Sequence, residues 1–259
     1  SGPELNGTTT PQDVGLGGNV DKKKDILVNK HGKRLSTRAV RRKLDLDRDV
    51  PQSLIDECLT IAQQAPTGGN REVTRFLVIR DPSLRAALAD IYRQGWAKYM
   101  DPSTGSGAQK RAGDAAAERQ RRVVASSLHL AENMERVPVL VIPCVRPRTD
   151  EASIVLQAST FGSVYPSVWS FMLAARARGL GTTLTTLHLF NERTAAERLG
   201  IPDHFQQVGL IPVAYATTTD FSPAPRRPLE EFRRIAGWDG DDPAGGRRTD
   251  GRSTDHLAA

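Results

Sequence analysis

The chain has 259 residues, of which 38% are hydrophobic and 25% charged, which is enough apolar sequence for the core of one globular domain. Its formal net charge of +6 is spread over several segments without a DNA- or RNA-binding motif, so we expect no nucleic-acid partner. Two distant cysteines give no sign of a disulfide framework or a metal site, and they predict a reducing, cytoplasmic setting. No apolar run is long enough to span a bilayer, so we expect no membrane partner.

Both ends of the chain are polar and lack an apolar period. Residues 1–25 are rich in Gly, Thr, Asn and Asp and are predicted to form a flexible arm. Residues 240–259 are predicted to be a disordered tail for the same reason. We therefore expect one domain over residues 26–239.

Within this domain, helical and extended patterns alternate. Ser36 or Thr37 would cap a short helix that continues into the basic cluster Arg38–Arg42. Apolar or small residues at helical spacing predict further helices over 51–64, 84–100, 111–135, 154–178 and 192–199. β-Branched and apolar runs predict strands over 74–80, 137–145, 180–187 and 208–215. This alternation indicates a sheet with helices on both faces.

Two polar segments suggest a nucleotide-like cofactor. The guanidinium groups of Arg38–Arg42 offer planar donor forks that match phosphate oxygens. The segment Pro66–Asn70 contains two glycines, which allow the backbone to approach a flat ring, and an asparagine that offers both a donor and an acceptor. A phosphate at one segment and a ring system at the other fit such a cofactor.

Four motifs in order resemble the nitroreductase superfamily of FMN-dependent oxidoreductases. They are Thr37–Arg42, Ala65–Asn70, Leu173–Ala175 followed by Gly179–Gly181, and Arg226–Leu229. Each motif alone is weak, but the ordered set is specific and spans residues 37–229. The resemblance implies an α+β fold, a three-layer α/β/α sandwich with a central mixed, mainly antiparallel sheet. It also implies a homodimer that exchanges helices, with the helix at 154–178 at its centre.

The resemblance also implies which residues bind FMN. Arg38 and Arg41 would hold the phosphate together with Arg226 and Arg227 from the far end of the chain. A backbone N–H near Thr186 or Leu187 would hydrogen-bond flavin N5. The complete set of expected cofactor-binding residues is Arg38, Ala39, Val40, Arg41, Pro66, Thr67, Gly68, Asn70, Thr183, Leu184, Thr185, Thr186, Leu187, Arg226 and Arg227.

The segment at about 90–122 is the least similar to the family, and we expect it to cover the open face of the flavin. Tyr92, Trp96 and Tyr99 would then contact a flat substrate, although aromatic residues at helical spacing also fit ordinary packing. His188 also allows two interpretations: its side chain could donate a proton to the substrate, or it could have only a structural role.

The expected activity is a two-step exchange at one site. NADPH or NADH passes a hydride to flavin N5 and leaves. A nitroaromatic or quinone-like substrate then binds at the same position and is reduced. No catalytic side chain is required, because the flavin carries the chemistry. The alternatives are a flavin-binding or storage protein without turnover, and a dehalogenase-like or flavin-consuming member of the same scaffold.

Overall fold

The computed structural model describes residues 18–21, 26–29, 38–103, 114–218, 221, 228–233 and 235. The chain divides into two compact units, residues 1–221 and 222–259. The described part of the second unit contains one short helix, α6 (Leu229–Phe232). In the first unit, β1 (Gly18–Asp21) and β2 (Ile26–Asn29) form an antiparallel pair, so four residues of the expected flexible arm are extended strand.

The main sheet of the first unit has six strands. Its order is β3 (Leu44–Asp45), β8 (Ile211–Ala216), β5 (Val139–Val145) and β4 (Thr74–Ile79). Two short strands complete it, β6 (Leu180–Thr182) beside β8 and β7 (Gln206–Gln207) beside β5. Every pairing between these described strands is antiparallel, so the parallel component expected for a mixed sheet is not seen among them.

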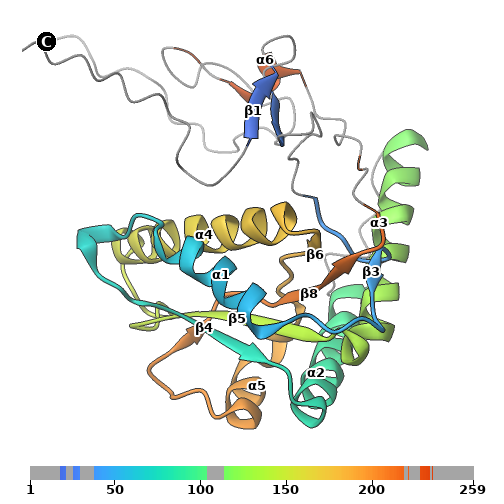
Figure 1. Cartoon of the computed structure of the whole chain (residues 1–259). Coiled ribbons are helices and arrows are strands. Elements are labelled where there is room, and N and C mark those ends of the chain that lie inside the picture. Colours follow the sequence, from blue (N-terminus) through green and yellow to red (C-terminus); the bar gives the residue numbers. More distant parts are fainter. Residues whose placement is uncertain are drawn as a thin grey trace, which may run out of the picture. The chain divides into compact units, whose positions relative to one another are not determined.

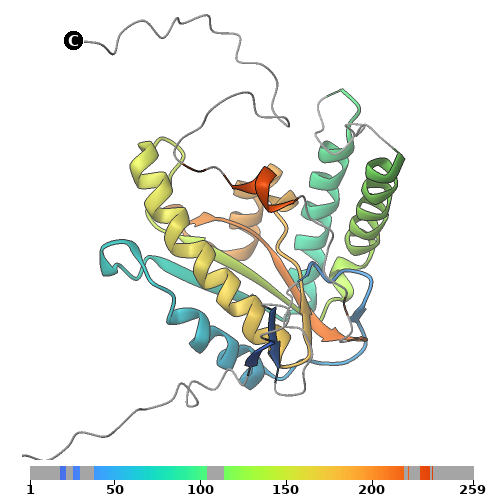
Figure 2. The ribbon, with the colours of Figure 1, turned by 90° about the horizontal axis from the view of Figure 1, so that it is seen from above.

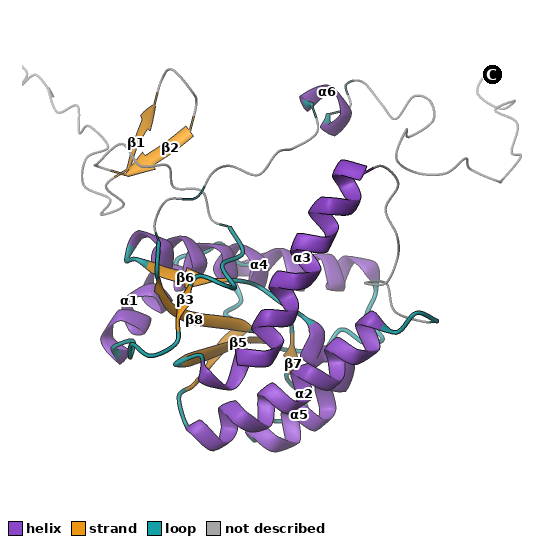
Figure 3. Cartoon of the chain, turned by 90° about the vertical axis from the view of Figure 1, so that its right-hand side faces the viewer, coloured by secondary structure: helices purple, strands orange, loops and turns teal. Residues whose placement is uncertain are grey.

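Helices cover both faces of this sheet (Figures 1 and 3). One face carries α1 (Gln52–Gln63) and α4 (Ile154–Ala177), and the other carries α2 (Pro82–Met100), α3 (Asp114–Asn133) and α5 (Glu192–Leu199). The central strand shows why: Val139 and Val141 pack with α1 and α4, whereas Leu140 and Ile142 pack with α2 and α3. The α+β fold and its three layers are thereby confirmed.

Helix ends follow local sequence signals. The Asp81 side chain accepts hydrogen bonds from the N–H groups of Ser83 and Leu84 at the start of α2. Gly200, with a φ of 67°, ends α5 in the left-handed conformation that glycine adopts without strain. Short 3₁₀ helices lie at η1 (Gly68–Asn70), η3 (Met134–Arg136) and η4 (Leu187–Asn191).

Two expectations about local structure were wrong. Residues 38–43 do not form a helix; they run as a loop and a turn, because the Val40 N–H bonds to the Thr182 carbonyl and the chain then enters β3. The extended segment expected over 180–187 ends at Thr182, and only Thr185 forms a further bridge, to Leu210. Among the described residues, no helix has the length and hydropathy needed to cross a bilayer.

Candidate functional site

The arginine segment lies against the residues that follow β6. The Val40 N–H donates to the Thr182 carbonyl at 2.9 Å, and Val40 is buried. This approach requires a glycine at position 181, since a Cβ there would lie 2.8 Å from Val40 Cγ1 and 2.9 Å from Leu44 Cδ2. Residues 38–41 are therefore held beside residues 183–187, which we call the cradle segment.

Arg41 is half-buried and has no carboxylate partner in the described part of the chain. Burial lowers the pKa of its guanidinium group, and the neighbouring Tyr92 opposes this shift. Two other partly buried arginines are paired with carboxylates: Arg148 with Glu192 at 3.1 Å and Arg178 with Glu57 at 2.8 Å. A partly desolvated cation without a counter-ion is unfavourable, so Arg41 is suited to an external anion. Arg38 and Ala39 are exposed.

Helix α2 packs closely behind the cradle segment. The Tyr92 hydroxyl lies 3.0 Å from Thr185 Oγ1, and Tyr92 is only 1% exposed. One turn further along, Gly95 is so close to the segment that a Cβ would lie 1.9 Å from the Leu187 carbonyl oxygen. This part of α2 therefore supports the segment through protein contacts.

Several polar groups of the cradle segment lack a hydrogen-bond partner among the described residues. The hydroxyl of Thr183 is buried and has no hydrogen-bond partner among the described residues. The Thr185 N–H is already used, because it donates to the Leu210 carbonyl at 2.9 Å. The N–H groups of Thr186 and Leu187, which precede or begin η4, have no acceptor in the described ranges.

The titratable groups buried elsewhere in the core are neutral at neutral pH. Burial lowers the pKa of His188 to about 4, and both of its ring nitrogens lack a partner among the described residues. Burial raises the pKa of Cys58 to about 11 and that of Cys144 to about 12. None of these three side chains is therefore poised as a proton donor or a nucleophile.

The loop at residues 66–70 lies in a different place. The Gly68 N–H donates to Ser163 Oγ of α4 at 2.9 Å, and a Cβ at Gly68 would lie 2.5 Å from Ser159 Oγ. At 1.5 Å per residue, Ser163 is about 20 Å before the end of α4, after which the chain enters β6. Figure 1 shows this loop and β6 at opposite ends of α4. Within one chain, Pro66, Thr67, Gly68 and Asn70 are thus separated from Arg41.

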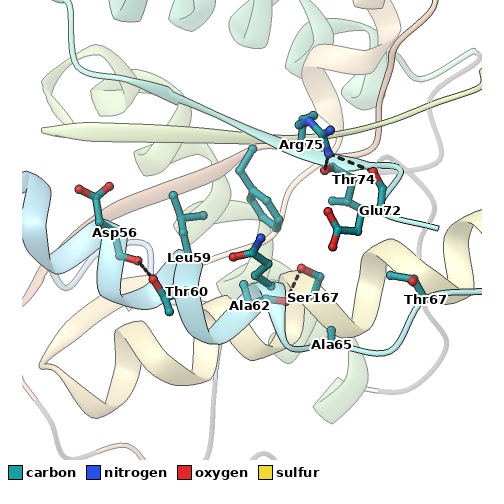
Figure 4. A pocket seen from close by; sticks show the side chains of 12 residues that line it. Asp56, Leu59, Thr60, Ala62, Ala65, Thr67, Glu72, Thr74, Arg75 and Ser167 are labelled. Carbon is teal, nitrogen blue, oxygen red and sulfur yellow. Dashed lines mark hydrogen bonds between the residues drawn. The ribbon is translucent and has the colours of Figure 1, made fainter. Parts of the chain in front are cut away.

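A cavity of about 480 Å³ lies beside this loop, between α1, α4 and β4 (Figure 4). The Ser167 hydroxyl of α4 donates to the Ala62 carbonyl of α1 at 2.8 Å, which closes one side. Figure 2 shows α1 and α4 side by side along this face. None of the lining residues comes from residues 38–41 or from the cradle segment, so this cavity is distinct from the surroundings of Arg41.

The expected substrate residues occupy different environments. Tyr92 is buried, and Trp96 is partly buried against the core. Tyr99 is also partly buried, with its ring centroid 6.1 Å from that of Trp96. Arg226 and Arg227 lie outside the described residues. The contact of Gly95 with Leu187 was not foreseen, although a glycine inside a helical pattern was a signal of close approach.

Comparison with known proteins agrees with the fold. The model of the Nitroreductase family matches residues 35–215, well over half of the chain. The chain belongs to the nitroreductase family. Structures similar to it include the FMN- and NADPH-dependent nitroreductase NfnB from Sphigopyxis sp. strain HMH, with 18% identity, a TM-score of 0.55 and coverage of 78% of this chain and 96% of that one.

Two other similar structures are a deiodinase and a BluB-like flavoprotein. An iodotyrosine deiodinase bound to FMN and 3-iodo-L-tyrosine is 19% identical, with a TM-score of 0.54 and coverage of 78% and 94%. A BluB-like flavoprotein from Clostridium difficile 630 is 18% identical, with a TM-score of 0.56 and coverage of 77% and 95%. At these identities the comparisons establish the shared fold.

Proposed function

We propose that this nitroreductase-family chain is an FMN-dependent oxidoreductase that uses NADPH or NADH to reduce nitroaromatic or quinone-like substrates. The observation that carries the proposal is Arg41, a half-buried cation without a carboxylate partner in the described residues, held beside the cradle segment. The description of one similar structure, NfnB, as an FMN- and NADPH-dependent nitroreductase supports the choice of cofactor and hydride donor.

The residues present fit a flavin mononucleotide. Arg41, with Arg38 nearby in sequence, supplies positive charge for a phosphate group. The N–H groups of Thr186 and Leu187 supply donors for the ring or its side chain, and the unpartnered Thr183 hydroxyl is buried shortly before them in the sequence. Since the Thr185 N–H is bonded to Leu210, Thr186 and Leu187 are the better candidates for the hydrogen bond to N5.

Bound FMN would supply the hydride chemistry between the nicotinamide and the substrate. The chain itself would bind the phosphate at Arg41, orient the ring along the cradle segment and stabilise negative charge through backbone N–H donors. No side-chain acid is assigned, because His188 is buried and its lowered pKa keeps it neutral. The binding surface would therefore act by orientation and electrostatics.

We also propose that the working form is a homodimer assembled on α4. This helix has no charged residue between Ile154 and Ala175, yet one face of it is exposed. Val155 is 77% exposed and Trp169 51% exposed, and the exposed residues recur at helical spacing: Val155, Ala158, Gly162, Tyr165 and Trp169. A second copy covering this stripe would also explain how the loop at 66–70 reaches a cofactor held at Arg41 of its partner, which one chain does not allow.

The test compares FMN with riboflavin, which lacks the phosphate. Calorimetric or fluorescence titrations give both dissociation constants for the wild type, for Arg41→Ala and for the control Arg42→Ala. Arg42 is exposed, and its hydrogen bond to the Ala125 carbonyl is long, at 3.4 Å. A charge-assisted contact contributes about 1.5–3 kcal/mol, so we expect the preference for FMN to fall about 10- to 100-fold in Arg41→Ala and to persist in the control. An unchanged preference in Arg41→Ala would contradict the assignment.

A further inference from the structure

Tyr92 places a hydroxyl group at the back of the cradle segment. Its ring is buried in the core on α2, where it is 1% exposed, and its hydroxyl lies 3.0 Å from Thr185 Oγ1. A buried tyrosine hydroxyl needs a hydrogen-bond partner. Here that partner is a side chain of the cradle segment, 93 residues away in the sequence, so the contact links α2 directly to the candidate site.

Arg41 is close enough to this hydroxyl for its charge to act on it. Burial raises the pKa of Tyr92, while the hydrogen bond with Thr185 and the positive charge of Arg41 oppose that rise. The raised pKa keeps the hydroxyl protonated at neutral pH, and a neutral hydroxyl both donates and accepts. Its oxygen is therefore a favourable neighbour for the Arg41 guanidinium, which lacks a carboxylate in the described ranges.

The backbone around Thr185 is held independently of Tyr92. The N–H and carbonyl of Thr185 form hydrogen bonds with Leu210 of 2.9 and 2.8 Å. These backbone bonds do not determine the χ1 rotamer of Thr185, because a threonine side chain has several staggered positions. The contact with the Tyr92 hydroxyl selects one of them.

We propose that Tyr92 is a positioning residue of the cofactor site: its hydroxyl fixes the orientation of the Thr185 hydroxyl near Arg41, where the phosphate of the ligand would bind. This inference rests on the proposed FMN function. It assigns Tyr92 a role behind the cofactor, acting through Thr185, in place of direct contact with substrate.

The test uses variants that remove one oxygen without opening a cavity. Tyr92→Phe keeps the ring in the core, Thr185→Val keeps the shape of the side chain, and Thr185→Ser keeps the hydroxyl. Tyr215→Phe is a control, because Tyr215 lies on β8 and its ring contacts Arg48, which is outside the cradle segment. Dissociation constants for FMN and riboflavin are measured for each variant, together with the visible absorbance spectrum of the bound flavin.

We expect Tyr92→Phe to weaken FMN binding about 3- to 10-fold and riboflavin binding less, so that the preference for FMN falls. Thr185→Val should have a similar effect, the double variant should be no weaker than the stronger single variant, and Thr185→Ser should recover most of the affinity. A merely structural role would lower stability without changing the ratio of the two dissociation constants.

The outcomes separate this inference from the proposed function. A wild-type protein that does not bind FMN overturns both. If FMN binds and depends on Arg41 while Tyr92→Phe keeps the wild-type FMN-to-riboflavin ratio, the FMN site stands and the role of Tyr92 is refuted. Additive losses in the double variant would also refute it, because the two hydroxyls would then act separately.

Discussion

The close approach of α2 to the cradle segment predicts a large effect of a single methyl group. In Gly95→Ala, the new Cβ would lie 1.9 Å from the Leu187 carbonyl oxygen and 2.7 Å from its carbonyl carbon. Ordinary contact begins at 3.4 Å, so the helix and the segment must separate by about 1.5 Å. Because both sides are backbone, this strain lies at the upper end of the range for overpacking, about 3 kcal/mol.

A gain in helix propensity of about 1 kcal/mol offsets part of this strain, which leaves a net loss of about 2 kcal/mol in the free energy of unfolding. Urea unfolding monitored by circular dichroism measures the loss. Ala97→Gly, at an exposed position of the same helix, measures the propensity contribution separately. A Gly95→Ala protein as stable as the wild type would show that α2 and Leu187 are not in this contact.

Two further predictions concern the exposed face of α4 and the buried histidine. Trp169→Glu places a charge on the stripe, so light scattering should show monomers, whereas Ala97→Glu on α2 should remain dimeric; a dimeric Trp169→Glu protein would refute the interface. Burial lowers the pKa of His188 to about 4, partly opposed by Glu192, whereas the unfolded value is about 6.5. The unfolded chain therefore binds the proton first, and the free energy of unfolding should fall by up to about 3 kcal/mol as the pH drops from about 6.5 to 4. Urea titrations at several pH values should show a shallower decline in His188→Gln, and an identical decline would contradict this.

Elements governed by local sequence could be predicted well. The apolar run at 137–145 indicated a strand covered on both faces, and all seven residues of β5 are buried. The helix expected over 192–199 has these bounds in α5, because Gly200 supplies its left-handed end. These features depend on residues within a few positions of each other, which is what a sequence pattern records.

Features that depend on distant contacts could not be predicted in the same way. The basic segment was expected to be helical, but the bond from Val40 to Thr182 joins positions far apart in the sequence and draws residues 38–40 into a loop. The β-branched residues at 183–187 favoured a strand, yet only Thr185 finds a partner before η4 begins. The position of Tyr92 beside Thr185 likewise depends on how α2 packs.

The central claim is that this chain binds FMN and passes reducing equivalents through it. The most direct measurement is the visible absorbance of the FMN-loaded protein under anaerobic conditions, first with NADPH and then with a nitroaromatic compound. The account predicts flavin bands that bleach with NADPH and return when the nitroaromatic is added. Bands that never bleach with NADPH or NADH would contradict the reductase, and a protein that acquires no flavin bands would contradict the FMN site itself.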